Sequence, residues 1–375
     1  MMFLLRVVIF LTFALFVFTA HVFAERGRYR DALLKKYAPV WVQSIGRYPS
    51  YDAVTKFDFD GNIDGRDNQD NVTSFPLQAT VYGEISAETT DSYYIFYGIY
   101  HPRDYDKPLR EWAIKGAAHE NDFEGAMLNV SKQTGKIRGV ETWFHNIFLQ
   151  CFHSAISNGD QTIDARINAE DDTHPILYVQ SGGHGVRCFQ KMDEERILDG
   201  SHKIYRISDS SDDIKKTEGL FIRYKLASFD VFIKNATGPF TETSMFVEPA
   251  DFGFRGKLLG KYISGKLKGD SGWARPKPPW SWADKRDSLR YGSWYLHPAF
   301  VFNRHFGYAL STVYINERGL RKRLNIYQTE LNEWIKEERQ GSFMKGLEKG
   351  ALHNICNGIR KFIYRIMDPI FFYFG

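Results

Sequence analysis

The spacing of hydrophobic positions changes along the chain. From about residue 40 to residue 248, short apolar runs alternate with turns rich in Gly and Asp, which predicts strands. The run Tyr93-Tyr94-Ile95-Phe96-Tyr97 is apolar at successive positions, as in a strand buried on both faces. Ile176 to Val179 and Leu220 to Ile222 are similar. The pattern therefore favours a mainly β protein, an antiparallel β-sandwich rather than βαβ units.

Helical spacing is present at both ends of this region. Leu33, Leu34 and Tyr37 recur at helical spacing before Pro39, which predicts a short N-terminal helix. The tail, residues 316–375, is expected to be an amphipathic helical extension because its apolar residues step by three and four. This extension is either a helical hairpin docked on the sandwich or a helix that lies on a membrane surface.

The remaining boundaries follow from composition. Residues 1–24 have a short n-region with Arg6, an apolar run and small residues before Glu25, which predicts a cleaved signal peptide and a secreted protein. An uncleaved anchor is the alternative. Residues 25–315 form the expected sandwich domain. Within it, residues 265–287 are rich in Pro and Trp, which predicts a rigid loop over one end of the sandwich.

Charge and cysteine content exclude several classes of protein. The 49 Lys and Arg against 45 Asp and Glu give a net charge of +4, and the basic residues are not striped between aromatics, so we expect no nucleic-acid partner. The 3 cysteines allow at most one disulfide, and Cys151 with Cys188 is favoured because both lie in the β-rich middle. A eukaryotic secretory pathway would make this a glycoprotein at the sequons of Asn71, Asn129 and Asn235.

The densest group of potential ligands is His119-Glu120-Asn121-Asp122-Phe123-Glu124-Gly125. Asp122 and Glu124 project on the same face of an extended chain, where two carboxylates repel unless a cation or a proton lies between them. His119 joins them if the chain turns before Asp122. This set suits Ca²⁺, Mg²⁺, Mn²⁺ or Zn²⁺, and the alternative is an acidic, solvated strand end.

Two further segments are candidates. His184 follows a predicted strand and lies between glycines, which leave an imidazole accessible in a turn. Asp60, Asn62 and Asp64 have the spacing of the first ligands of a calcium loop, so they could hold a second cation. A polar turn is the alternative, because Asn71 stands where such a loop needs Glu.

The order of several motifs resembles the superfamily that contains the necrosis-inducing-protein-like toxins and the vacuolar protein sorting 62-related proteins. The motifs are IYHPRD from Ile99, HENDFEG from His119, HPILYVQSGGHG from His174, PPWSWAD from Pro278 and WYLHPA from Trp294. They lie between about Leu33 and Phe300, outside the tail. The toxins read G-H-R-H-D-W-E at the second motif, so His119, Asp122 and Glu124 match, whereas Asn121 replaces a histidine and Phe123 a tryptophan. The resemblance implies an antiparallel sandwich with a bound cation at these three residues.

Our leading hypothesis is a secreted, cation-dependent binding protein that recognises a polar glycan or lipid headgroup, with a membrane-directed tail. His184, Asn121, Trp280 and Trp282 would contact the ligand. One alternative is a metal-dependent hydrolase of phosphate or glycosyl esters, with His184 as acid or base. Another is a structural exported protein with a stabilising ion. The sequence has no GxSxG elbow, P-loop or GxGxxG motif.

Overall fold

The computed structural model describes residues 27–62, 68–108, 118–144, 147–152, 162–166, 169–197, 200–229 and 293–315, with Trp282, Asp284 and Leu289. The predicted signal peptide, most of the Pro/Trp-rich loop and the predicted helical extension lie outside these residues. So do Asp64, Asn235 and Trp280, and the side chains of His119 and Glu120.

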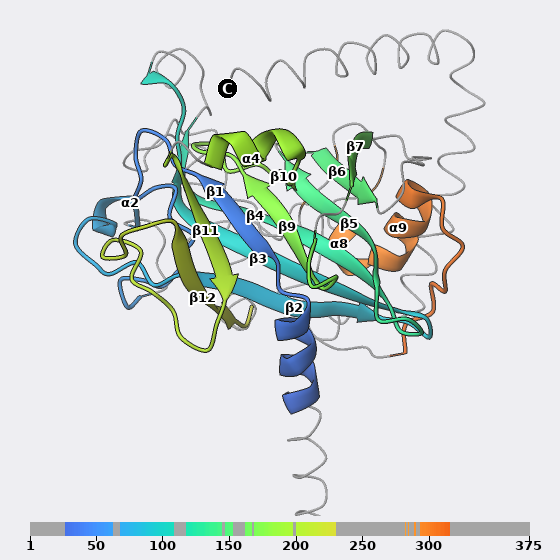
Figure 1. Ribbon diagram of the computed structural model, residues 1–375. Coiled ribbons are helices and arrows are strands. Elements are labelled where there is room, and N and C mark those ends of the chain that lie inside the picture. The colour runs from blue at the N-terminus through green and yellow to red at the C-terminus, as the bar shows by residue number, and fades with distance from the viewer. Residues whose placement is uncertain are drawn as a thin grey trace, which may run out of the picture. The chain divides into compact units, whose positions relative to one another are not determined.

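Among the described residues, twelve strands form one sheet (Figure 1), and its path runs β10-β9-β1-β11-β12-β2-β3-β4-β5-β6-β7, with β8 beside β9. The mainly β prediction is confirmed. The strands are β1 (Val40–Ser44), β2 (Thr80–Glu88), β3 (Ser92–Asp104), β4 (His119–Ser131), β5 (Ile137–Phe144), β6 (Ile147–Phe152), β7 (Thr162–Arg166), β8 (Ala169–Glu170), β9 (His174–Val179), β10 (Val186–Cys188), β11 (His202–Ile207) and β12 (Phe221–Ala227).

Strand pairing is mixed, which differs from the wholly antiparallel arrangement that the turns suggested. β2 to β6 form an antiparallel series. β1 with β9, β11 with β12, β12 with β2 and β6 with β7 are parallel pairs. Parallel pairing needs long connections, and β1 lies more than a hundred residues before β9. Short-range turn signals therefore could not reveal it.

The sheet curls so that its two halves pack face to face. In Figure 1, β1 and β9 lie in front of β3, β4 and β5. The core between them contains Trp41, Tyr97, Leu128 and Leu177, all fully buried. A disulfide joins Cys151 of β6 to Cys188 of β10, the pair that the sequence favoured. The sandwich is thus one sheet folded on itself and closed by a covalent link.

A second apolar layer covers the outer face of β2 to β6. It contains α8 (Ser293–Leu296) and α9 (Pro298–Phe306). Phe96 of β3 packs against Trp282, Trp294 and Tyr295, with ring centroids 5.1 to 5.8 Å apart. Ile95 and Tyr97 face the inner core, so β3 is buried on both faces, as its apolar run predicted.

The smaller helices lie around the sheet. Residues 27–36 are helical, as predicted, and Pro39 follows their end. α2 (Asn68–Asn71) and α4 (Lys191–Ile197) are short, and α4 is anchored by the buried pair of Arg187 and Asp193. None of the helices in the described part of the chain has the length and apolar character needed to span a membrane.

The fold also places two of the sequons. Asn129 is fully buried on the outer face of β4, under the helical layer. Asn71 ends α2 and donates from Nδ2 to Asp60 Oδ2 at 2.8 Å. A fully buried side chain leaves no room for an oligosaccharide, so a glycan at Asn129 is incompatible with this packing.

Candidate metal centre

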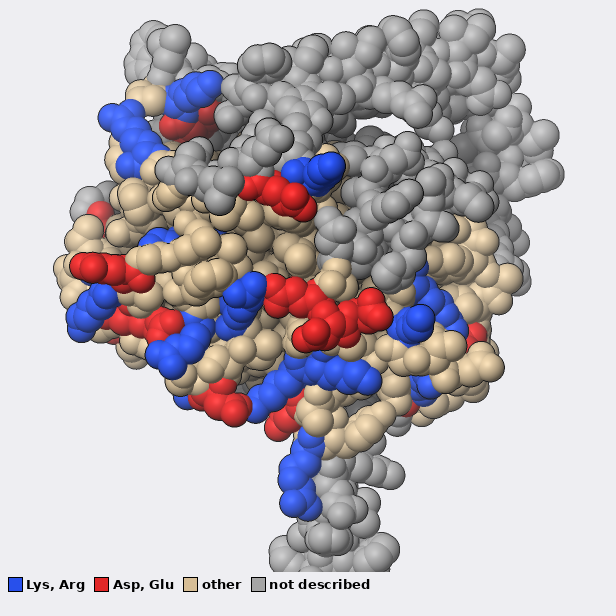
Figure 2. Space-filling model, viewed as in Figure 1, with Lys and Arg blue, Asp and Glu red and all other residues tan. Residues whose placement is uncertain are grey.

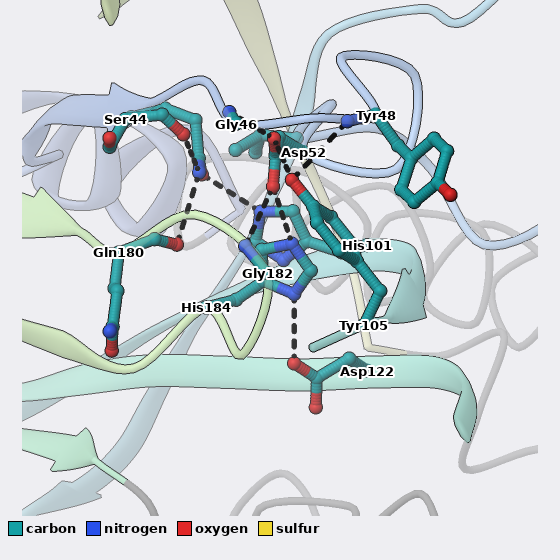
Figure 3. Close-up of polar contacts among 12 residues, drawn as sticks. Ser44, Gly46, Tyr48, Asp52, His101, Tyr105, Asp122, Gln180, Gly182 and His184 are labelled. Carbon is teal, nitrogen blue, oxygen red and sulfur yellow. Dashed lines mark hydrogen bonds and ion pairs between the residues drawn. The ribbon is translucent and has the colours of Figure 1, made fainter. Parts of the chain in front are cut away.

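Four strand ends meet at one edge of the sandwich. β1 and β9 are parallel, so their carboxyl ends lie at the same edge, where β3 also ends and β4 begins. This brings together His101 of β3, Asp122 of β4 and His184 of the turn after β9 (Figure 3). Gln43 of β1 contacts His101. His101 and Asp122 are direct neighbours across the β3–β4 pair.

His184 is held between two carboxylates. Its Nδ1 lies 3.0 Å from Asp122 Oδ2 and its Nε2 lies 3.2 Å from Asp52 Oδ1, and its side chain is 0% exposed. The backbone of His184 has a left-handed φ of 47°. Gly182, with a φ of 81°, passes so close to the Tyr105 carbonyl that a Cβ there would lie 2.6 Å from its oxygen. These glycine-flanked turns deliver the imidazole inward rather than to solvent, contrary to the accessible position that we expected.

Asp52 ties three segments to this centre. Its Oδ1 accepts from Gly182 N at 2.9 Å, and its Oδ2 accepts from Gly46 N at 2.7 Å and from the Tyr105 hydroxyl at 2.8 Å. One fully buried carboxylate thereby fixes the loop after β1, the end of β3 and the turn of His184. A buried carboxylate with this many donors is well satisfied.

Hydrogen bonding fixes the tautomer of His101. Gln43 Nε2 donates to the carbonyls of Ser44 at 2.8 Å and Gln180 at 3.3 Å, so Gln43 Oε1 must be the acceptor that His101 Nε2 contacts at 2.9 Å. His101 Nε2 therefore carries the hydrogen, and the lone pair is on Nδ1. That Nδ1 is buried and has no hydrogen-bond partner. It is a buried acceptor with nothing to accept.

The two imidazoles have opposite charge preferences. Burial lowers the pKa of His184, but the hydrogen bonds that its ring donates to Asp122 and Asp52 more than offset burial and raise the pKa to about 9. Burial, and then the charge on His184, hold the pKa of His101 well below its usual range. Their rings stack with centroids 3.7 Å apart and planes 2° apart. Without an ion, a neutral imidazole thus lies against a protonated one.

Within the described residues, one potential ligand atom each from His101, Asp122 and His184 lies within 4.8 Å of the other two. Such a group could hold a metal ion. Two imidazole nitrogens and a carboxylate oxygen are the donor set of many divalent sites for Zn²⁺, Mn²⁺ and related ions. The second nitrogen of His101 is already bonded to an amide oxygen, the outer contact that usually orients a metal-binding histidine.

The structure brings together two of the predicted site residues, Asp122 and His184, and it adds His101 and Asp52. Glu124 is buried two residues along β4 from Asp122. Asn121, with a φ of 59°, accepts hydrogen bonds from Asn68 and from the Tyr100 hydroxyl. It is thus engaged away from the imidazoles. The ligand set of His119, Asp122 and Glu124 stays a prediction, because the side chain of His119 lies outside the described residues.

The other predicted contacts lie elsewhere. Trp282 is fully buried and stacks on Trp143 with centroids 4.9 Å apart, so its contacts here are with the protein's own core. Asp60 accepts from the backbone N of Asn62 at 3.1 Å and from the Nδ2 atoms of Asn62 and Asn71. These amide donors satisfy the carboxylate as in a polar turn. Whether Asp60, Asn62 and Asp64 take a second cation remains a prediction.

His101 and Asp52 were missed for different reasons. His101 belongs to the motif IYHPRD, but nothing near it in sequence suggests a ligand. Asp52 stands in a Tyr-rich loop without a carboxylate or histidine neighbour. Only the register of β3 with β4 and the curl of the sheet bring them to the centre. A periodicity argument could have placed His101 on the inner face of β3, because it has the parity of Ile95, Tyr97 and Ile99.

No family model and no curated protein matches this sequence. Among solved structures, it is similar to Necrosis and Ethylene inducing Protein 2 from the causal agent of cocoa's witches' broom disease, at 18% identity and a TM-score of 0.27, over 65% of this chain and 83% of that one. A structure described as a toxin fold for microbial attack and plant defense has 16% identity and a TM-score of 0.26, over 42% and 67%.

A third structure, NLPPya in complex with mannosamine, has 17% identity and a TM-score of 0.22, over 31% of this chain and 46% of that one. These are necrosis- and ethylene-inducing proteins, the family that the sequence motifs resemble. TM-scores this low carry no ligand, ion or activity over to the present chain.

Proposed function

We propose that this protein is a cation-dependent binding protein, in which His101, Asp122 and His184 hold a divalent cation and the ordered edge around the ion recognises a polar glycan or lipid headgroup. The observation that carries the proposal is the partnerless Nδ1 of His101, a buried lone pair beside a carboxylate and a second imidazole. A divalent cation satisfies all three groups at once.

The ion would also relieve an electrostatic conflict. Asp52 and Asp122 are buried carboxylates on either side of His184, and the proton on that imidazole offsets part of their charge. An ion that binds His184 Nδ1 must take the place of the proton on that nitrogen. Ion binding should therefore release a proton and become tighter as the pH rises.

The headgroup and the compartment are supported only by the sequence. The predicted signal peptide at residues 1–24 supports secretion, and the amphipathic pattern of residues 316–375 supports a membrane-directed tail. The described surroundings of Trp282 and Asn121 do not support contacts of these residues with a ligand, and Trp280 lies outside the described residues. We therefore place recognition at the edge of the centre.

A structural ion is the second candidate, because all three ligand residues are buried. It would connect the turn after β9 to β3 and β4 without contacting a glycan or headgroup. The hydrolase alternative has less support. His184 is fully buried and both of its nitrogens are bonded to carboxylates, which leaves no atom for proton transfer to a substrate.

Ion binding is tested by thermal unfolding. The melting temperature with Ca²⁺, Mg²⁺, Mn²⁺ or Zn²⁺ is compared with that in chelator. At one hundred times the dissociation constant, the correct ion should add about 2.7 kcal/mol to the free energy of unfolding. His101→Gln and Asp122→Asn should lose this gain. His174→Gln is the matched control, because that imidazole bonds the Ala38 carbonyl at the other end of β9.

Two results would count against the proposal. If none of the ions raises the melting temperature of the natural sequence, the proposed metal centre is wrong. A second result would be an ion that stabilises the protein without affecting ligand binding. If retention on headgroup-bearing vesicles or immobilised glycans is the same with and without chelator, the ion is structural only.

A further inference from the structure

A group of aromatic and basic side chains lies next to the metal centre, and we call it the tyrosine–arginine patch. It consists of Arg47 and Tyr48, which are exposed, and of Tyr51 and Arg103, which are half-buried. Tyr48 is 38% exposed. The Arg47 guanidinium lies 5.1 Å from the centroid of the Tyr48 ring, and that of Arg103 lies 5.7 Å from the centroid of Tyr51. Two cationic groups thus flank two adjacent phenol rings, whose centroids are 5.4 Å apart.

The patch is built on a fixed base. The buried Tyr105 ring lies beneath it, 5.1 Å from Tyr48 and 6.1 Å from Tyr51. The Tyr105 hydroxyl donates to Asp52, the carboxylate that also contacts His184. Gly46 lets the loop pass close to this ring, since a Cβ there would lie 2.5 Å from the Tyr105 oxygen. The rings are therefore positioned before any ligand arrives, which lowers the entropy cost of binding.

The chemistry of the patch points to one ligand class. A tyrosine face offers apolar contact with a polar edge and suits the apolar face of a sugar ring. A guanidinium pairs with carboxylate or phosphate in two parallel hydrogen bonds. On the face that Figure 2 shows, acidic and basic side chains of the described residues are interspersed, so no broad charged surface there selects an anion. The local arrangement of Arg47 and Tyr48 provides the selection that we propose.

We propose that the tyrosine–arginine patch binds an acidic saccharide, a sugar that carries a carboxylate or phosphate group, either free or as a lipid headgroup. The proposal deepens the function proposed above and rests on it in one respect: an ion on His184 would hold Asp52, and through it the loop that presents Tyr48. It names the ligand class and places the contact on Arg47 and Tyr48 rather than on the buried histidines.

The test is titration calorimetry of the full chain, with the stabilising ion present. The probes are a hyaluronan tetrasaccharide, which carries carboxylates, and chitotetraose, which is neutral. We expect saturable binding of the first, at least about tenfold weaker binding of the second, and weakening by added salt. Arg47→Gln and Tyr48→Ala should each weaken the acidic probe about tenfold. Sedimentation with phosphatidylinositol vesicles, against phosphatidylcholine, shows whether a lipid headgroup is also accepted.

The matched control is a second stacked pair, Arg206 over Phe221, whose guanidinium lies 4.6 Å from a ring centroid on β11 and β12. Arg206→Gln and Phe221→Ala should leave the acidic probe unaffected. The proposal is wrong if the neutral probe binds as tightly as the acidic one. It is also wrong if Arg47→Gln and Tyr48→Ala bind the acidic probe as tightly as the natural sequence does. These variants do not touch the ion ligands, so their ion-induced rise in melting temperature should remain. If a patch variant loses saccharide binding but keeps the rise in melting temperature, the loss is due to the patch and not to the ion. If the natural sequence itself shows no rise, the proposed ion site is wrong.

Discussion

Two buried groups that combine a carboxylate with an imidazole lie on opposite faces of the same half of the sheet. On the inner face, His184 lies between Asp52 and Asp122, and the stacked His101 has a nitrogen with no partner. On the outer face, Glu141 of β5 accepts from Trp294 Nε1 at 2.7 Å and contacts His305 Nδ1 at 2.5 Å. The residue types are nearly the same.

The difference is in the balance of donors and acceptors. Both carboxylate oxygens of Glu141 have donors from α8 and α9, so that group fastens the helical layer to the sheet. The inner group has two carboxylates, one protonated imidazole and a lone pair left over. The unpaired nitrogen of His101 distinguishes the inner group, because a cation would pair with it, whereas the oxygens of Glu141 already have partners. The predictions below test this distinction, from the largest expected effect to the smallest.

The largest effect should come from the disulfide, which ties β6, next to the strand of Glu141, to β10, which follows His184. Cys151 and Cys188 are 37 residues apart, and closing a loop of that length is worth about 4 kcal/mol. Cys151→Ala/Cys188→Ala should lower the free energy of unfolding by about this amount in urea titrations. A loss below about 1 kcal/mol would show that the two halves hold together without the link.

Glu141→Ala should come next, at about 3 kcal/mol, because it leaves the buried His305 and the Trp294 N–H without their acceptor. Urea unfolding measures the loss, and the stabilisation by the ion should be unchanged. The contrasting variant is Asp209→Ala, which removes the partner of Lys35 in an exposed pair and should have no measurable effect. A change in ion affinity in Glu141→Ala would contradict the separation of the two groups.

Without an ion, stability should depend on pH in the direction that the inner imidazoles dictate. The raised pKa of His184 gives stability that is complete below its unfolded value of 6.5 and is lost as the pH rises through about 9. The lowered pKa of His101 gives stability that is lost as the pH falls below 6.5. Stability in chelator should therefore peak near pH 6.5 and decline by roughly 3 kcal/mol towards pH 9.

Unfolding in urea across pH 5 to 10, with and without the stabilising ion, measures this profile. His184→Gln should abolish the alkaline decline, and added ion should reduce it because the ion binds more tightly as the proton leaves. An alkaline decline that persists in His184→Gln would assign the effect to another group.

Tyr105→Phe should have the smallest effect, about 1 kcal/mol, because Asp52 keeps its other donors. The substitution should also lower the affinity for the ion, since Asp52 positions His184 and Tyr105 donates to Asp52. Tyr224→Phe is the matched control: it removes a buried hydroxyl that donates to the Pro39 carbonyl, away from the centre. Equal ion affinity in both variants would show that Asp52 needs no help from Tyr105.

The sequence predicted what depends on local pattern. The burial of Tyr94 and Phe96 on one face of β3, and of Ile95 and Tyr97 on the other, follows from the apolar run. Helix 27–36 follows from the spacing of Leu33, Leu34 and Tyr37. Asp122 and His184 were found because they stand among other polar or glycine residues that mark a turn or a strand end.

What the sequence could not predict depends on distant pairing. His101 and Asp122 meet through the register of β3 with β4, and Gln43 meets Gln180 through the parallel pairing of β1 with β9. The accessibility of His184 was misjudged, because its turn folds back between Asp52 and Asp122. α9 was missed, since Ala299, Phe300, Val301 and Phe302 are all buried and show no helical alternation of polar and apolar positions.

The burial of Asn129 makes glycosylation at this residue incompatible with the packing of β4. β4 hydrogen-bonds to β3 on one side and β5 on the other, and Asn129 is opposite Tyr94 and Gly139 in those pairs. An oligosaccharide attached to its amide would keep α9 from closing over the sheet. In a cell that glycosylates Asn-Val-Ser tripeptides during synthesis, attachment of an oligosaccharide at residue 129 and packing of α9 over β4 would therefore exclude each other.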